Sequence, residues 1–279
     1  MMGARSELWK FRLASMRENL KLRLFRPERH HDFFIVTAAH NASRYIERHL
    51  GSIDTQHYAK QHVHHLIIDD ASTDDTPDRI DAWLKRQRPQ RRVELVRNEH
   101  NMGGCANYAR GFRQAPADSI VIQVDGDDWL PDDRVLAYLN MVYHDCHVWM
   151  TYNTWARPDG GPALYNHAIP EEIISSNQIR EFKWISSHLH SFRASLFSHV
   201  RDEDLIDPET GDYWRSAVDQ SQYLPMFELA GHHARHLQRV TYIYNLHEDS
   251  LMTTKEPQQT NCRERIRQLP KYEPLRTLV

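Results

Sequence analysis

The chain has 279 residues, a net charge of −3 and 40% hydrophobic residues, which is typical of one large or two small globular domains. No apolar run approaches the roughly 20 residues that a membrane-spanning helix needs. The N-terminal residues lack the apolar core of a secretory signal, so we expect none. Three scattered cysteines are too few for a disulfide framework. A cytoplasmic location is therefore the expectation.

Charge is distributed unevenly along the chain. Residues 1–31 carry a balance of +5 and residues 253–279 a balance of +3, which leaves −11 on the residues between them. Nucleic-acid binding over a broad surface requires a basic face that displaces counterions. The acidic body therefore argues against a nucleic-acid partner.

Residues 5–26 are predicted to form an amphipathic helix, because apolar residues recur at spacings of three and four. The apolar stripe consists of Trp9, Leu13, Met16, Leu20 and Leu24. Basic residues occupy the other faces. Two interpretations remain open: the helix docks on the body or on a twin subunit of a homodimer, or it lies on an anionic membrane surface.

From residue 33 onward, short apolar runs alternate with segments of helical periodicity. The expected strands cover residues 33–37, 63–68, 93–96 and 119–124. The expected helices cover residues 43–53 and 101–112 and begin at residues 76 and 131. This alternation predicts an α/β fold with a mostly parallel central sheet flanked by helices.

The second half of the chain is less regular. Strands are expected at residues 148–152 and 239–244, and helices at 176–183, 193–199 and 219–230. Residues 253–279 are polar and weakly patterned, so we interpret them as a C-terminal extension. The predicted organisation is an N-terminal helix over 1–31, a main domain over 32–252 with two halves that meet at residue 131, and the extension over 253–279.

Two acidic clusters follow expected strands. Asp69 and Asp70 end the second strand, and Asp125-Gly126-Asp127-Asp128 ends the fourth. Ligands of open α/β sheets bind at the carboxyl ends of the strands. Crowded carboxylates are costly unless a cation neutralises them, and hard divalent cations prefer oxygen ligands. Gly126 would leave room for a phosphate. The alternative is a solvated acidic loop before the next helix.

Four segments resemble motifs of family 2 glycosyltransferases, in the same order and spacing. Residues 35–41 resemble the opening strand and turn, and 67–74 the signature of two Asp, a small residue, Ser and a further Asp. Residues 97–107 resemble the Asn-x-x-Asn-x-Gly segment, and 124–131 the Asp-x-Asp metal motif. One departure is Ala39-His40, where the family commonly has Thr-Tyr.

The resemblance implies a fold of the GT-A type and a metal-dependent, inverting glycosyltransferase of the hexosyltransferase class. The donor would be a nucleotide-diphospho-sugar, with a UDP-sugar favoured, and the acceptor a hydroxyl of a glycan or a lipid-linked molecule. Polysaccharide biosynthesis for the cell surface is the expected role. The cofactor would be Mn²⁺ or Mg²⁺ bridging the two phosphates. Residues 32–131 would then be the nucleotide-binding half and 132–252 the acceptor half.

The resemblance also implies residue roles on the donor side. Asp70, or its neighbour Asp69, would hydrogen-bond the base. Asp125, Asp127 and His247, the last in a segment similar to the family's late strand and loop, would hold the metal. The expected nucleotide-sugar site consists of Thr37, Ala39, Asn41, Asp69, Asp70, Asn101, Gly103, Asn107, Asp125 and Gly126.

The candidate general base is Asp219, at the start of an expected helix after the metal motif. Val218 stands where the family commonly has a glutamate. The alternative is that Asp219 caps the helix, and its nearby competitors are Asp202, Asp204, Asp207 and Asp212. A further polar cluster, with acceptor binding, diphosphate binding or a structural role open to it, consists of His188, His190 and Arg193.

Two other functions stay open. One is a non-catalytic GT-A-like domain that binds a partner or a glycan. The other is a sugar nucleotidyltransferase, which is less favoured because residues 38–41 are not the glycine-rich basic loop of that class. An NAD-binding Rossmann domain is excluded, because no Gly-x-Gly-x-x-Gly follows the first strand.

Overall fold

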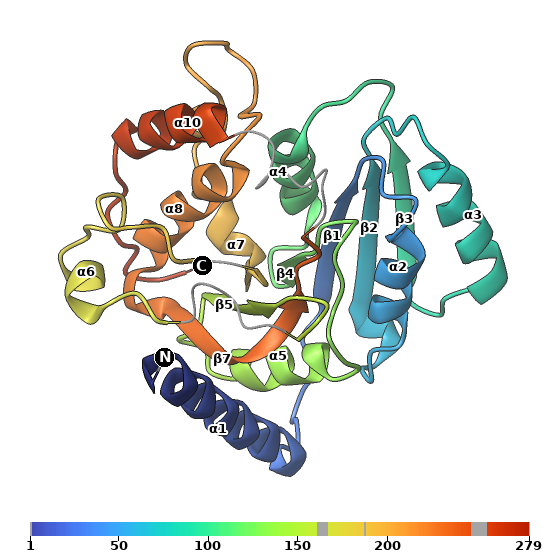
Figure 1. Ribbon diagram of the computed structural model, residues 1–279, viewed down its shortest axis with the longest axis horizontal. Coiled ribbons are helices and arrows are strands. Elements are labelled where there is room, and N and C mark those ends of the chain that lie inside the picture. Colours follow the sequence, from blue (N-terminus) through green and yellow to red (C-terminus); the bar gives the residue numbers. More distant parts are fainter. Residues whose placement is uncertain (1, 161–166, 187, 247–255, 279) are drawn as a thin grey trace.

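The computed structural model describes residues 2–160, 167–186, 188–246 and 256–278, with the side chains of 2–12, 153–154 and 256–259 left out of the description. The described strands form one seven-stranded sheet in the order β3-β2-β1-β4-β6-β5-β7, with helices packed around it (Figure 1). The strands are β1 Phe33–Ala39, β2 Val63–Asp69, β3 Arg92–Arg97, β4 Ile120–Gln123, β5 Met150–Ala156, β6 Ser191–Arg193 and β7 Ala234–Ile243.

The helices before residue 231 follow the predicted order, with boundaries shifted by a few residues, whereas α10 was not predicted. They are α1 Met2–Leu24, α2 Ile46–Asp54, α3 Thr76–Gln87, α4 Gly104–Gln114, α5 Val135–Tyr143, α6 Glu171–Ser175, α7 Ala194–Phe197, α8 Val218–Ala230 and α10 Glu256–Gln268. Short 3₁₀ turns cover η1 Lys60–His62, η2 Asp202–Leu205 and η3 Gly231–His233.

The first half of the sheet is parallel, as predicted. β1 pairs with β2 and β4, and β2 pairs with β3, all in parallel. Alternate side chains face opposite layers: Val36 and Leu66 join the core cluster that contains α4, whereas Ile67 packs with α2 and α3. Because both faces are covered, these strands are nearly continuous apolar runs. The carboxyl ends of β1, β2, β3 and β4 therefore lie at the same edge of the sheet.

The second half differs from the prediction in two places. β6 runs antiparallel between β4 and β5, where the sequence predicted no strand, while the helix expected at 193–199 is present over the shorter range of α7. Three residues are too few to show an alternating pattern. The helix expected at 176–183 instead lies at α6, since Pro170 precedes it and Asn177, with a φ of 51°, follows its end.

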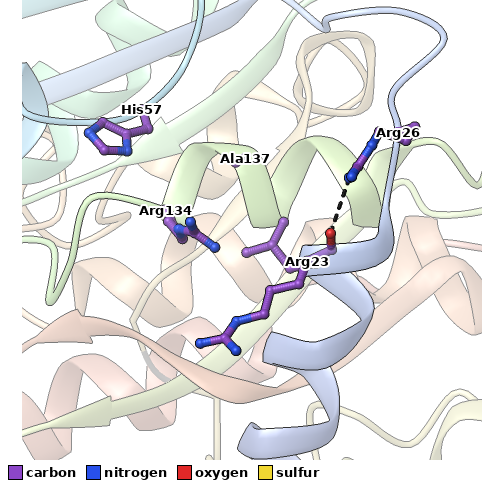
Figure 2. Close-up of a pocket in the computed structure, with 6 residues that line it drawn as sticks. Arg23, Arg26, His57, Arg134 and Ala137 are labelled. Carbon is purple, nitrogen blue, oxygen red and sulfur yellow. Dashed lines mark hydrogen bonds between the residues drawn. The ribbon is translucent and has the colours of Figure 1, made fainter.

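Helix α1 docks on the body through a face that was not the predicted apolar stripe. Glu18 accepts a hydrogen bond from the Tyr138 hydroxyl at 3.0 Å, Asn19 accepts one from Arg239 at 2.9 Å, and Leu22 packs on the core cluster around α5. Figure 2 shows the last turn of α1 beside the start of α5. Met16, Leu20 and Leu24 of the stripe are exposed, so the helix docks on the body, as one of the two interpretations expected, but not through these residues. The Trp9 side chain lies outside the description.

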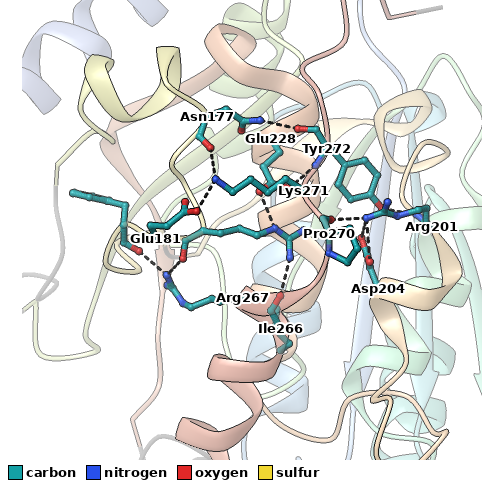
Figure 3. Close-up of polar contacts among 12 residues, drawn as sticks. Asn177, Glu181, Arg201, Asp204, Glu228, Ile266, Arg267, Pro270, Lys271 and Tyr272 are labelled. Carbon is teal, nitrogen blue, oxygen red and sulfur yellow. Dashed lines mark hydrogen bonds and ion pairs between the residues drawn. The ribbon is translucent and has the colours of Figure 1, made fainter.

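The C-terminal residues, predicted as an extension, are held on the second half of the domain by buried polar contacts. A buried ion pair joins Arg180 to Glu228 at 2.7 Å, and Arg180 also donates to the Ile266 carbonyl of α10 at 2.7 Å. Glu228 accepts from the Tyr272 backbone at 3.2 Å. Arg267 donates to the carbonyls of Arg180 and Phe182 (Figure 3). The packing of α10 could not be predicted from the sequence, because this helix is mostly polar and contributes few apolar residues.

We expect Glu228→Ala to lower the free energy of unfolding by about 3–5 kcal/mol, because it leaves the buried Arg180 guanidinium without its carboxylate. Urea unfolding of the purified protein measures this loss. The double variant R180M/E228L removes both charges and should recover much of the stability. A loss below about 1 kcal/mol in the single variant, which is the level of an exposed ion pair, would contradict the structural role given to this pair.

Candidate active site

The carboxyl ends of β1, β2 and β4 bring the two acidic clusters to one edge of the sheet. Ala39 lies opposite Asp69 in the parallel register, and its carbonyl accepts the Asp70 backbone N–H at 2.8 Å. The Ala38 carbonyl accepts the Gly126 N–H at 3.0 Å. The end of β1 therefore lies between the clusters, as the sequence predicted for an α/β fold.

Asp70 uses both carboxylate oxygens within the protein. Its oxygens accept the backbone N–H groups of Met102 and Gly103 at 2.7 and 2.8 Å and the Asn98 amide at 2.8 Å. Burial acts to raise the pKa of Asp70, but hydrogen bonds from Met102, Asn107, Asn98 and Gly103 outweigh it and lower the pKa below the ordinary value. Asp70 therefore organises the loop that leads into α4.

Asp69 has a different environment. The residue is buried, and its Oδ1 has no hydrogen-bond partner among the described residues. A buried carboxylate oxygen without a donor is costly, which points to a ligand that supplies one. Of the two carboxylates at this strand end, Asp69 is thus the one with an unused acceptor.

Several predicted donor-site residues have structural partners. The Thr37 hydroxyl is fully buried between His49 and His65, at 2.9 and 3.0 Å, so this side chain does not line a nucleotide pocket. The Asn41 side chain accepts the Thr73 backbone N–H at 2.8 Å and ties together the loops after β1 and β2. Asn107 is also buried, and its oxygen accepts the Asn98 amide at 2.8 Å.

The loop before α4 is bridged to the acceptor half by an arginine. Arg215 donates to the Asn101 carbonyl at 3.2 Å and to its side-chain oxygen at 3.1 Å. Gly103 has a φ of 83°, and a Cβ there would lie 2.9 Å from the Arg215 guanidinium. Glycine is therefore favoured at position 103 by backbone conformation, and a larger residue would also displace the Arg215 guanidinium. Sequence reasoning missed Arg215, which has no motif around it.

In the Asp-x-Asp segment, the carboxylates have separate environments. Asp125 accepts hydrogen bonds from the Tyr108 hydroxyl and from the Gln123 amide, the latter at 3.2 Å. Asp128 is buried and accepts from the Tyr242 hydroxyl and the Asn245 N–H, both at 2.7 Å. Burial and the charges of Asp127 and Asp125 raise the pKa of Asp128 well above its ordinary value. Asp128 is thus a structural residue of this loop.

The structure explains the glycine at position 126 differently from the sequence prediction. A Cβ at this position would lie 2.7 Å from the Ala39 Cβ and 3.1 Å from the Ala38 carbonyl oxygen. The space beside Gly126 is filled by the end of β1, so the prediction that it leaves room for a phosphate is wrong. The glycine instead allows the acidic loop to pack against the first strand.

The donors at this edge fit a divalent cation. Asp125 and Asp127 are both partly exposed and offer hard carboxylate oxygens. Their negative charges raise the pKa of the neighbouring Asp128, which shows that the carboxylates are crowded here. Among the described residues, no three His, Cys, Asp or Glu side chains form a metal site by themselves. A cation held by one or two carboxylates and substrate phosphates needs no third protein ligand. His247 lies outside the described residues, two positions after Asn245.

Asp219 lies in the first turn of α8, but it does not cap that helix. The N-cap position is Ala217, with a φ of 54°, and Asp219 accepts the adjacent Gln220 N–H at 2.9 Å and a side-chain hydrogen bond from Trp184. Burial raises the pKa of Asp219, while the positive charge of His188 opposes the rise. The alternative of a helix cap is therefore wrong. A raised pKa suits a carboxylate that accepts a proton near neutral pH.

A tyrosine of α8 is joined to the acidic loop by hydrogen bonds and feels the charge of Asp219. Tyr223, one turn after Asp219 on α8, donates from its hydroxyl to Gln123 at 2.6 Å, and Gln123 in turn donates to Asp125. Burial and the charges of Asp125 and Asp219 raise the pKa of Tyr223 well above its ordinary value. The candidate base Asp219 and the metal-motif residue Asp125 are thus both close enough to Tyr223 for their charges to raise its pKa.

The competitors of Asp219 have other partners. Asp202 pairs with Arg113, Asp204 with Arg201 at 3.1 Å, and Asp207 with Arg265 at 2.6 Å. Asp212 is exposed, and its carbonyl accepts the Asp207 backbone N–H. None of these contacts leads toward the acidic loop.

The predicted cluster of His188, His190 and Arg193 divides into three roles. His188 stacks on Tyr242 and Tyr244 with ring centroids 4.9 and 5.3 Å apart, beside the charge of Asp219. His190 is buried, stacks on Tyr223 at 3.6 Å and is a structural residue.

Arg193 lies at the wrong end of the sheet for substrate binding. It is opposite Ile120 in the antiparallel register, at the start of β4, whereas the acidic loop follows the end of β4. Its guanidinium donates to the carbonyls of Val148 and Tyr143, at 2.8 and 3.1 Å. The predicted acceptor or diphosphate role of Arg193 is therefore wrong.

Sequence reasoning missed the tyrosines that hold the acidic loop. Tyr108 contacts Asp125, Tyr242 contacts Asp128, and Tyr223 reaches Gln123. A buried tyrosine needs a partner for its hydroxyl. That rule could have marked Tyr108, which directly follows the motif at residues 97–107, but it does not identify the partner.

The chain was compared with known proteins. The family model described as "Glycosyl transferase family 2" matches residues 34–202. No curated protein sequence matches closely enough to count as a relative. Among solved structures, S. aureus TarS 1-349 in complex with UDP-GlcNAc is 18% identical, with a TM-score of 0.57 over 80% of this chain and 61% of that one.

A second similar structure is the mannosyltransferase PcManGT from Pyrobaculum calidifontis in complex with GDP-Man and Mn²⁺. It is 17% identical, with a TM-score of 0.56, and the match covers 88% of this chain and 69% of that one. At such identities the likeness establishes the fold, which is the predicted GT-A type. The chain spans about 61% of the length of the TarS fragment that it matches.

Proposed function

The chain belongs to glycosyl transferase family 2, and on that premise we propose that it transfers a sugar from a nucleotide-diphospho-sugar to an acceptor hydroxyl, with inversion. The observation that supports this proposal best is the convergence of Asp69, Asp125 and Asp127 at one sheet edge, with the charges of both Asp125 and Asp219 acting on the buried Tyr223. Similar folds hold UDP-GlcNAc and GDP-Man. The role that we favour is cell-surface polysaccharide synthesis.

We assign the metal to Asp125 and Asp127, as Mn²⁺ or Mg²⁺. When bound there, the cation would neutralise the donor diphosphate and stabilise it as a leaving group. Tyr108 and Gln123 hold Asp125 in place through hydrogen bonds. Asp128, fixed by Tyr242 and Asn245, anchors the loop on the end of β7. Asp125 and Asp127 would therefore be offered to the cation from a loop that is held in place by hydrogen bonds.

Asp219 is the group that we assign as general base. Its carboxylate would accept the proton of the acceptor hydroxyl while that oxygen attacks the sugar. Burial holds its pKa above the ordinary value, and the neighbouring charge of His188 limits the rise. A single carboxylate base on the acceptor side favours one displacement and inversion of the anomeric centre. Proton NMR of the first product would show the anomeric configuration.

Nucleotide binding is the first experiment for the proposed function. Thermal unfolding with UDP or GDP, in the presence of Mn²⁺ or of EDTA, should show stabilisation by one nucleotide that depends on the cation. A ligand at a hundredfold excess over its Kd stabilises a protein by about 2.7 kcal/mol. Hydrolysis of the matching nucleotide-sugar then separates a transferase from a domain that only binds. No stabilisation by either nucleotide would contradict the proposal.

We expect Asp69→Asn to weaken nucleotide binding by about 10- to 100-fold, because hydrogen bonds to charged groups contribute about 1.5–3 kcal/mol. The reason is the unpartnered, buried Oδ1, which we propose accepts an N–H of the base. Calorimetric titration with the nucleotide measures the effect, and pyrophosphate, which lacks a base, is the control ligand. Equal losses for both ligands would place Asp69 in the diphosphate site or in the fold instead.

A further inference from the structure

The outer face of α1 carries an unusual concentration of exposed apolar side chains. Among the described residues, the large hydrophobic side chains that are exposed are Met16 at 69%, Leu20 at 57%, Leu24 at 72% and Leu246 at 38%. Three of the four lie on α1 at spacings of four residues, so they share one face of the helix. Single exposed apolar residues are ordinary, but a row of three is not.

Basic side chains border this row on both sides. With 3.6 residues per turn, Arg17 and Lys21 follow one flank of the row and Arg23 lies on the other. The acidic Glu18 points away, toward Tyr138 of the body. The outer face of α1 is therefore an apolar stripe between two basic margins, while the inner face holds the helix on the domain.

A basic pocket adjoins the end of this stripe. It has a volume of about 310 Å³ between α1 and α5, and it is lined by Leu22, Arg23, Arg26, His57, Arg134 and Ala137. Figure 2 shows the side chains of Arg23, Arg26 and Arg134 around it. Within the described part of the chain, none of these three guanidinium groups forms an ion pair with a carboxylate. Two acidic groups lie close to the lining residues: Asp133, 3.4 Å from His57, and Asp132, which accepts the Arg134 backbone N–H at 2.9 Å and pairs with Arg239.

From this arrangement we propose that the outer face of α1 lies on an anionic phospholipid bilayer and that the pocket takes lipid phosphates. The apolar stripe would enter the boundary between headgroups and acyl chains, and the basic margins would contact anionic headgroups. None of the described helices is both long and apolar enough to cross a bilayer, so the proposed attachment is peripheral. It concerns where the enzyme acts and is independent of its reaction.

Charge favours a bilayer over a second copy of the chain. A two-fold interface would place the same patch of both subunits face to face. It would bring two sets of Arg17, Arg23 and Arg134 close together, and among the described residues none of these guanidinium groups is paired with a carboxylate of its own chain. Three apolar side chains also cover much less area than the roughly 1,200 Å² that a stable interface buries. An anionic surface neutralises the same charges.

The experiment is co-sedimentation of the full-length protein with vesicles. One set contains phosphatidylcholine alone, and the other contains equal parts of phosphatidylcholine and phosphatidylglycerol. We expect binding to the anionic vesicles and release when NaCl is raised from about 0.1 to about 1 M, which shortens the Debye length from about 10 to about 3 Å. Equal binding to both vesicles, or binding to neither, would overturn the proposal.

Variants separate the two parts of the surface. Leu20→Gln with Leu24→Gln removes exposed apolar groups and should abolish sedimentation, with thermal unfolding unchanged. Arg134→Glu changes the pocket without touching α1 and should weaken binding at least fivefold, since each basic side chain near an anionic surface contributes about that factor. Lys85→Glu, an equal charge change on α3, is the matched control and should bind normally. Normal binding by Arg134→Glu would overturn the role of the pocket.

The same variants test the alternative occupant. Sedimentation equilibrium of the wild-type protein without lipid should show a monomer. A dimer that the leucine double variant converts to a monomer would overturn the proposal, because the stripe would then face a second copy of the chain.

Discussion

Asp127→Ala will reduce the affinity for a nucleoside diphosphate in the presence of Mn²⁺ by about 10²-fold or more. The acidic loop offers Asp125 and Asp127 as partly exposed carboxylates, and each oxygen ligand lost from a cation that neutralises a diphosphate removes several kcal/mol of electrostatic stabilisation. Calorimetric titration with Mn²⁺ present measures the change. Thermal unfolding without ligand should be nearly unaffected, because Asp128 provides the hydrogen bonds that hold this loop on β7.

Two controls decide what such a loss means. In EDTA, the wild type and Asp127→Ala should bind the nucleotide equally weakly, since the variant lacks only the contribution made through a cation. Asp133→Ala removes an acidic side chain six positions further on, at the half-exposed pair with His57, and should keep wild-type affinity. If Asp127→Ala retains its affinity in Mn²⁺, the assignment of the metal to this loop is wrong.

The parallel half of the fold could be predicted because its strands are covered on both faces. Phe33–Ala39 and Val63–Asp69 are nearly continuous apolar runs that end in polar loops, so both the strands and the edge that carries the acidic clusters can be found from sequence. β6 could not be found, because three residues paired between two strands have no period of their own. The polar α10 was missed for a related reason: it is held by a buried ion pair and backbone contacts rather than by an apolar face.

The roles of neighbouring site residues depend on contacts that spacing does not reveal. Asp69 and Asp70 are adjacent, yet one directs its oxygens to the loop before α4 and the other keeps a buried oxygen unpartnered. His188 and His190 are two residues apart, yet one lies beside the charge of Asp219 and the other is buried against Tyr223. Alternation along an extended segment sends adjacent residues such as Asp69 and Asp70 to opposite sides, but it does not separate residues two apart. The different roles of His188 and His190 therefore depend on the groups that pack against each of them.

The N-terminal helix shows a limit of periodicity itself. A stripe of apolar residues is expected to face the core, and on α1 the stripe of Met16, Leu20 and Leu24 faces outward instead. The docked face uses Glu18, Asn19 and Leu22, of which only one is apolar. Polar residues can anchor a helix when their partners, here Tyr138 and Arg239, are fixed on the body. The apolar stripe then remains available for a different environment.

Asp219→Asn should lower the rate of sugar transfer by about 10²–10⁴-fold while the affinity for the donor stays within a fewfold of wild type. Asparagine keeps the size of the side chain and the oxygen that accepts the Gln220 N–H, but it cannot accept the acceptor's proton. Steady-state kinetics with both substrates, together with calorimetric donor binding, separate the two effects. Asp212→Asn is the matched control on an exposed aspartate nearby and should transfer at the normal rate.

The pH dependence gives this variant a second, independent signature. Burial raises the pKa of Asp219, so kcat/KM of the wild type should fall on the acidic side at a pH above the ordinary aspartate value, and the residual activity of the Asn variant should lack that limb. A raised carboxylate pKa in the folded state also means that ionisation opposes folding above the unfolded pKa. Asp219→Asn should therefore unfold at the same or a higher temperature at neutral pH. A loss of activity together with a loss of stability would instead make Asp219 a structural residue of α8, and unchanged turnover would leave the chain without its assigned base.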